Sequence, residues 1–126
     1  MTAPFAFGVA FVLLAAALPA QRLSAPDRVE AMPIGDSSRW LGPRDVPADA
    51  LAARKRDFTL YSLMINPRGR VATCYIMASS GSHRLDQAGC WLLIERGRFR
   101  LGTRYDGKAA SGGSAELRVS WAPAAN

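Results

Sequence analysis

Five polar residues that lie within eight positions could form a nucleophilic site: Ser79, Ser80, Ser82, His83 and Asp86. One serine hydroxyl would be the nucleophile, His83 its base and Asp86 the carboxylate that orients the base. Hydrolase triads usually combine residues from separate elements, whereas these follow one another along the chain. We therefore predict a polar turn in which Asp86 favours a helix N-terminus, and we expect no enzyme activity. No Gly-rich phosphate loop follows a predicted strand, so no cofactor is expected.

Cys74 and Cys90 are the two cysteines of the chain, and His83 is its one histidine. These three residues lack the C-x-x-C spacing of structural zinc sites, so no metal is expected. In an oxidising compartment, an even number of cysteines favours a disulfide between Cys74 and Cys90. Such a bond would close a loop of about 16 residues. Two buried free thiols are the alternative.

Basic side chains exceed acidic ones, with 16 Lys and Arg against 10 Asp and Glu and a net charge of +6. Arg96, Arg98 and Arg100 alternate with other residues and would share one face of an extended segment. With a fourth, they form a predicted basic face of Arg96, Arg98, Arg100 and Arg104. This face could attract anionic envelope polymers, and a merely solvated surface is the alternative. Nucleic acid is not expected, because the repeated aromatic residues of a base-stacking platform are missing.

The N-terminal segment predicts export. Residues 5–18 form an uncharged apolar run of about 14 residues, which is shorter than the roughly 20 residues of a membrane-spanning helix. We predict a signal peptide at residues 1–20, with retention as an inner-membrane anchor as the alternative, and a periplasmic location. Residues 21–38 consist largely of Gln, Arg, Ser, Pro, Asp and Gly with few large apolar side chains, which indicates a linker. The domain is expected at residues 39–123, and residues 124–126 form a tail.

The remaining patterns predict a small α+β domain. Pro47, the acidic first turn and the basic last turn indicate a short helix within residues 45–55. Residues 58–65 and 71–78 indicate a β-hairpin around Pro67 and Gly69. A second helix is expected at residues 85–96, with residues 91–94 deeply buried, and a half-buried strand at residues 115–121. We therefore expect an antiparallel sheet of about three strands with two helices packed on one face.

A family resemblance follows from short motifs between Trp40 and Trp121. These are Asp45-Val46-Pro47, Pro67-Arg68-Gly69-Arg70-Val71, Cys74-Tyr75-Ile76, Ser79-Ser80-Gly81, Leu85-Asp86 before Cys90, Arg98-Phe99, Asp106-Gly107 and Val119-Ser120-Trp121. In their order and spacing, they resemble the C-terminal domain of TonB-family energy transducers of Gram-negative bacteria, in a version with paired cysteines.

The resemblance implies a periplasmic protein-binding module in energy-dependent transport. In that family, the edge of the sheet at the last strand pairs with an extended segment of an outer-membrane receptor. That role would fall here on Ala115, Glu116, Leu117, Arg118, Val119, Ser120 and Trp121. The chain departs from the family in its short linker and in an apolar N-terminal segment without histidine. A structural or stress-related envelope protein that binds anionic polymers through the basic face is the alternative function.

Overall fold

The β-hairpin has the bounds that the sequence predicts, with strand β2 at Phe58–Ile65 and strand β3 at Val71–Ala78. The computed structural model describes residue 8 and residues 28–123. In the turn, the Asn66 side chain accepts hydrogen bonds from the N–H groups of Arg68 and Arg70 at 2.9 and 3.0 Å. Gly69 has a φ of 78°, which residues with a Cβ rarely adopt. These local features explain why the hairpin could be predicted from sequence.

The sheet differs from the prediction, because it has five strands and mixed pairing in the order β3-β2-β5-β1-β4. The expectation of a three-stranded antiparallel sheet is therefore wrong. Strands β2, β3 and β5 were expected, whereas β1 (Arg28–Pro33) and β4 (Phe99–Leu101) add two more. Strand β1 runs parallel to β5 (Gly112–Ser120) and antiparallel to β4. The helical elements are the 3-10 turns η1 (Ser37–Arg39) and η2 (Pro43–Asp45) and the helices α1 (Ala48–Ala52) and α2 (His83–Arg96).

Part of the predicted linker belongs to the sheet. Strand β1 lies within residues 21–38 and the turn η1 begins there, so the described part of the predicted linker contains regular structure from Arg28 on. Only Ala31 is buried in β1, and β4 has three residues. Arg28–Ala31 and Phe99–Leu101 alternate polar and apolar residues over only four and three positions, a pattern too short to reveal a strand in sequence. Their hydrogen bonds to neighbouring strands are made only once the chain is folded.

Residues 1–7 and 9–27 lie outside the described part of the chain, and so do residues 124–126. The predicted signal peptide, the first part of the predicted linker and the tail fall on these positions. Within the described residues, no helix combines the length and the hydropathy needed to cross a membrane.

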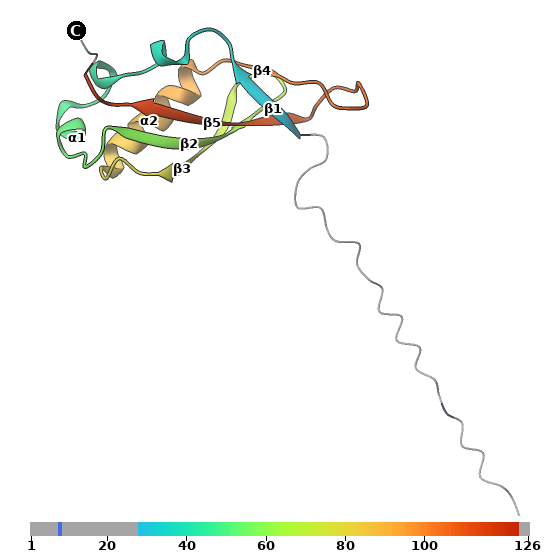
Figure 1. The fold of residues 1–126 in the computed structure, drawn as a ribbon, viewed down its shortest axis with the longest axis horizontal. Coiled ribbons are helices and arrows are strands. Elements are labelled where there is room, and N and C mark those ends of the chain that lie inside the picture. The colour runs from blue at the N-terminus through green and yellow to red at the C-terminus, as the bar shows by residue number, and fades with distance from the viewer. Residues whose placement is uncertain (1–7, 9–27, 124–126) are drawn as a thin grey trace, which may run out of the picture.

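Helix α2 covers one face of the sheet (Figure 1). Strand β2 buries every second side chain, and Tyr61, Leu63 and Ile65 belong to the core beneath the helix. Leu93 of α2 and Trp121, just after β5, are fully buried in the same core. The helix begins at an N-cap, Ser82, whose hydroxyl accepts a hydrogen bond from the N–H of Leu85 at 3.3 Å.

The burial expected for residues 91–94 is only partly right. Leu93 is buried, but the side chain of Trp91 is 69% exposed. The run is apolar around most of the helix, yet α2 contacts the sheet on one side only (Figure 1). The exposure of Trp91 shows that this residue is not on the covered side. Apolar composition therefore did not identify which side of the helix is covered.

Gly89→Ala is expected to lower the free energy of unfolding by about 2 kcal/mol. Alanine in place of a helical glycine is usually stabilising, by up to about 1 kcal/mol. Here the new methyl group would overlap the hydroxyl of Tyr61, which is fully buried and donates a hydrogen bond to the backbone oxygen of Asp86 at 2.8 Å. Urea unfolding measures the change. Gln87→Ala, on the exposed side of the same helix, is the control and should change stability by less than about 0.5 kcal/mol; a stabilised Gly89→Ala variant would contradict the prediction.

Candidate functional site: the open edge of strand β5

The last strand is not at the edge of the sheet, which corrects the position expected for residues 115–121. Strand β5 is the third of the five strands in the sheet. It pairs with β2 from Phe58, opposite Ser120, to Ile65, opposite Gly113. On its other side, β1 pairs with it only through Arg28–Glu30, opposite Gly112–Ser114. Strand β1 then turns to pair with β4. Among residues 28–123, the second half of β5 therefore has a strand on one side only.

The backbone groups on the open side of β5 can be assigned from the register. The N–H of Trp121 donates to the carbonyl oxygen of Asp57 on the β2 side at 2.7 Å. Because backbone N–H and C=O groups alternate in direction from one residue to the next along a strand, those of Leu117 and Val119 also point to β2. Those of Glu116, Arg118 and Ser120 point to the open side. No backbone partner for these three residues is found there within residues 28–123.

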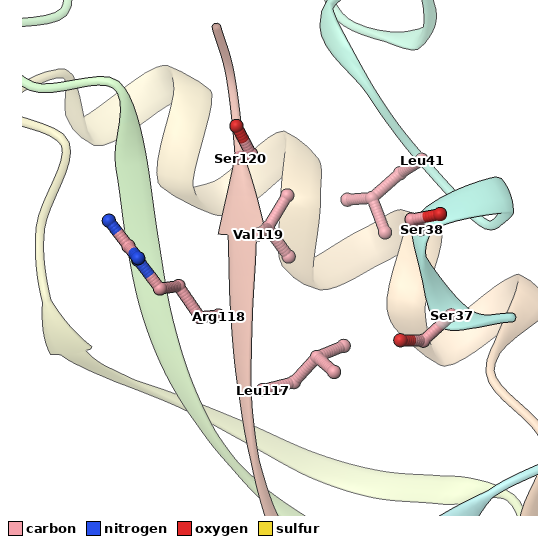
Figure 2. A pocket seen from close by; sticks show the side chains of 7 residues that line it. All are labelled: Ser37, Ser38, Leu41, Leu117, Arg118, Val119 and Ser120. Carbon is pink, nitrogen blue, oxygen red and sulfur yellow. The ribbon is translucent and has the colours of Figure 1, made fainter.

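A small cavity lies beside this open edge. Its volume is about 130 Å³, and it separates β5 from the segment that contains η1. Figure 2 shows the side chains of Leu117 and Val119 pointing toward Leu41, while Arg118 points the other way, over β2. The full lining consists of Ser37, Ser38, Leu41, Leu117, Arg118, Val119 and Ser120. The cavity thus has apolar side chains at its base and serine hydroxyls at its rim.

On the opposite face of the sheet, a second cavity of about 360 Å³ begins where β1 leaves β5. It is lined by Glu30, Ser62, Ser114, Ala115 and Glu116. Farther along β5, the guanidinium of Arg118 lies 4.4 Å from the centre of the Phe58 ring, which holds this side chain against the sheet. Both faces of the open stretch are therefore bordered by accessible space. An added extended segment could place alternate side chains in the two cavities.

Sequence reasoning missed the far wall of this site. Ser37, Ser38 and Leu41 fall in or beside the predicted linker, and only the tertiary structure brings them opposite β5. The apolar pair Trp40 and Leu41 was the available signal, because both side chains pack in or against the core.

Of the five residues considered for catalysis, Asp86 is buried and accepts three hydrogen bonds. Its carboxylate is 1% exposed and accepts hydrogen bonds from the Thr59 hydroxyl at 2.7 Å, the Ser80 N–H at 3.0 Å and the Ser79 hydroxyl. Burial raises the pKa of Asp86, but these donors outweigh it and hold the pKa below its ordinary value. The predicted polar turn is present, and the carboxylate connects it to β2.

His83 does not join this network. It is exposed at the first position of α2, and no hydrogen bond between His83 and Asp86 occurs in the described part of the chain. The indole N–H of Trp121 instead donates to the Thr59 hydroxyl at 2.8 Å, which extends the network into the core. No group of three or more His, Cys, Asp or Glu residues is placed to hold a metal ion among the residues described.

Cys74 of β3 and Cys90 of α2 form a disulfide, which confirms the predicted pair. The bond joins the outermost strand at one end of the sheet to the helix that covers it. The alternative of two free thiols is excluded in this structure.

The four arginines of the predicted basic face are divided among different elements. Arg96 belongs to the last turn of α2 and bonds the carbonyl oxygen of Trp40 at 2.7 Å and the Asp45 carboxylate at 3.0 Å. Hydrogen bonding by Arg96 lowers the pKa of Asp45. Arg104 pairs with Asp106 at 2.8 Å. Only Arg98 and Arg100 keep the expected spacing, because helix α2 continues through Arg96 and not as an extended segment.

Comparisons with known proteins add no assignment, since no family model, curated protein or solved structure matches the chain. The functional argument therefore depends on the geometry described above.

Proposed function

We propose that this protein is a binding module that captures an extended segment of another protein by strand addition at the open edge of β5. The observation that carries the proposal is the outward direction of the backbone groups of Glu116, Arg118 and Ser120, beside a cavity lined by Leu41, Leu117 and Val119. Unpaired backbone groups on a strand give affinity for an extended chain, and the adjoining side-chain pockets give selectivity.

More particularly, we propose a TonB-like role in which the partner is a periplasmic segment of an outer-membrane receptor. The motifs that carry the TonB resemblance include parts of β3, of α2 and of the end of β5, and the others lie mostly in the turns and loops that join the elements. The disulfide between Cys74 and Cys90 supports an oxidising compartment such as the periplasm. The role in energy-dependent transport is part of the proposal and depends on the identity of the captured receptor.

The proposed partner has a defined shape. Because β1 already occupies the first residues of β5, an incoming segment begins near Ser114 and extends past Ser120. Its alternate side chains face the apolar cavity with Leu117 and Val119 on one side and the cavity with Glu30 and Glu116 on the other. A segment of about seven extended residues spans this length, at about 3.3 Å per residue.

Amide hydrogen exchange tests the proposal with synthetic peptides from the periplasmic segments of outer-membrane receptors encoded in the same genome. In the free protein, we expect fast exchange at Glu116, Arg118 and Ser120 and slow exchange at Leu117 and Val119, whose N–H groups bond β2. A bound peptide should slow exchange at the first three amides by at least about 100-fold. Protection at another part of the molecule, with these three amides unchanged, would contradict the proposal.

A pair of variants at Arg118 isolates the backbone contribution. Arg118→Pro removes an N–H that points away from β2, so the ladder between β2 and β5 keeps its bonds. Arg118→Ala removes the same side chain and keeps the N–H. We expect the proline variant to bind the peptide at least about tenfold more weakly than the alanine variant. The reason is that proline removes one backbone hydrogen bond to the peptide and disturbs the pairing of the two strands. Equal binding by the two variants would rule out strand addition at this position.

Photo-crosslinking in cells extends the test to the natural partner. A photoreactive residue at Glu116 is expected to capture an outer-membrane receptor, whereas one at Tyr105, in the loop between β4 and β5, serves as the control. Equal capture of the receptor from both positions would argue against a site at β5.

A further inference from the structure

A second surface, separate from the β5 edge, collects exposed apolar side chains. The described residues include seven large hydrophobic side chains that are exposed, and four of them lie on β3 or on the helix beside it. They are Tyr75, Ile76, Met77 and Trp91, with exposed fractions of 58, 37, 55 and 69%. Apolar side chains gathered at one place on a small protein usually mark an interaction surface.

The backbone of β3 is also unpaired along this surface. Strand β3 is the outermost strand beside β2, and no strand of residues 28–123 lies on its other side. The groups of β2 that face β3 alternate with those that face β5, so Ser62 bonds Tyr75 and Met64 bonds Thr73. The N–H and C=O groups of Cys74, between these two pairs, therefore point outward. Ala72 and Ile76 continue this outward stretch, which ends at a register shift on each side.

The β3 edge lacks charge and proline, although its pairing with β2 shifts register on either side of the stretch from Thr73 to Ile76. The sequence of β3, VATCYIMA, contains no charged residue and no proline, and it is eight residues long. Natural edge strands are commonly kept apart by lysine, by proline or by being very short. A groove of about 320 Å³ adjoins the edge, with no charged residue in its lining of Ala72, Thr73, Cys74, Ile76, Gln87, Cys90, Trp91 and Ile94.

We propose that this edge binds a second copy of the same chain, with the two β3 strands antiparallel about a twofold axis at Cys74. The outward groups of Ala72, Cys74 and Ile76 are spaced evenly around Cys74, so this edge is complementary to itself. Ala72 of one copy faces Ile76 of the other, and Cys74 faces Cys74, so that every outward group is paired. The two sheets join into one continuous sheet.

The side chains follow the same symmetry. Cys90 is bonded to Cys74, so α2 is held close to the axis, and Trp91 lies next to Cys90 in the groove. The two Trp91 side chains therefore meet near the axis on the helical face. On the other face, Tyr75 of each copy lies opposite Thr73 of its neighbour. Although each chain has a net charge of +6, no charged residue of β3 or of the groove opposes its counterpart.

The apolar area is of the size that a dimer needs. Tyr75, Ile76, Met77 and Trp91 together expose on the order of 400 Å². Each partner of a standard stable interface buries roughly 800 Å². These four side chains therefore supply about half of that area, and the backbone edge and neighbouring residues of α2 supply the rest. A second copy is favoured over an unrelated segment because a twofold axis at Cys74 pairs the two edges and places the exposed Tyr75, Ile76 and Met77 of each copy against the other copy.

Analytical ultracentrifugation tests the dimer on protein made from the complete gene and purified in the form that cells export. We expect a mass of twice that of the chain, with dissociation on dilution. Trp91→Lys should weaken the dimer at least about tenfold, because a central aromatic residue dominates such interfaces. Tyr105→Lys changes a 95% exposed aromatic residue far along the chain from this edge and should leave the dimer unchanged. A monomer at every concentration, or equal effects of the two variants, would overturn the proposal.

A crosslinking experiment tests the register separately. When a Thr73→Cys variant is mixed with a Tyr75→Cys variant under mild oxidation, we expect a disulfide-linked dimer, because the two positions face each other across the axis at a separation a disulfide can span. Each variant alone should link several-fold less, since residue 73 lies opposite residue 75 and not opposite itself. Equal linkage in all three samples would refute the register. The β5 edge takes no part in this dimer, so the two proposals can fail independently.

Discussion

Replacing Asp86 with alanine is expected to lower the free energy of unfolding by about 4 kcal/mol. The carboxylate is 1% exposed and accepts hydrogen bonds from the hydroxyls of Thr59 and Ser79 and from the N–H of Ser80. Without it, these donors remain in the interior with no acceptor, and the bond from the Trp121 indole to Thr59 loses its support. Urea unfolding measures the loss. Asp36→Ala, which removes a carboxylate on the exposed turn η1, should cost less than about 1 kcal/mol.

The same carboxylate makes stability depend on pH. Burial raises the pKa of Asp86, but the hydrogen bonds from Ser79, Ser80 and Thr59 outweigh it, so the folded-state pKa lies below the ordinary value of 3.8. The unfolded chain therefore binds the proton more readily. The stabilisation is complete above the unfolded-state pKa and is lost as pH falls through the folded-state pKa.

Asp86→Asn separates the charge from the packing. Asparagine keeps an acceptor oxygen for Thr59 and Ser80, so we expect a smaller loss than with alanine, and it does not titrate. Unfolding curves measured from pH 7 down to acid should be flatter for this variant than for the original protein. An equally steep acid dependence in Asp86→Asn would show that another group causes it.

The disulfide is expected to contribute about 3 kcal/mol to the free energy of unfolding, because it closes a loop of 16 residues in the unfolded chain. The Cys74→Ala, Cys90→Ala double variant removes the bond without leaving a reactive thiol. Its urea midpoint should fall accordingly, as should that of the original protein in reductant. Adding reductant to the double variant is the control and should change nothing. A double variant as stable as the oxidised protein would contradict this assignment.

The candidate site was predicted in part. Residues 115–121 were singled out as a strand that binds a partner, and the strand is present, but its place at the edge of the sheet was wrong. An open edge nevertheless exists along its second half, because β1 pairs with three residues and then turns away. Which side of a strand is free depends on all of its neighbours, and one of these neighbours lies in a segment predicted to be a linker.

The β3 surface could have been suspected from sequence. A strand of eight residues without charge or proline is unusual at an edge, and its position outside β2 is a tertiary property. Trp91 was expected in the core because the run from Trp91 to Ile94 is apolar. Its exposure follows from the single sheet beneath α2, which covers one side of the helix.

The sequence by itself determined the elements that depend on neighbouring residues. The hairpin followed from Pro67, Gly69 and two apolar runs, helix α2 from Asp86 near its start and its apolar run, and the disulfide from an even number of cysteines. Only the tertiary structure decided the five-stranded order, the burial of Asp86 and the two free edges. Strands β1 and β4 are short and bury one residue each, so they are held by hydrogen bonds to distant parts of the chain, and their local alternation is too brief to identify them.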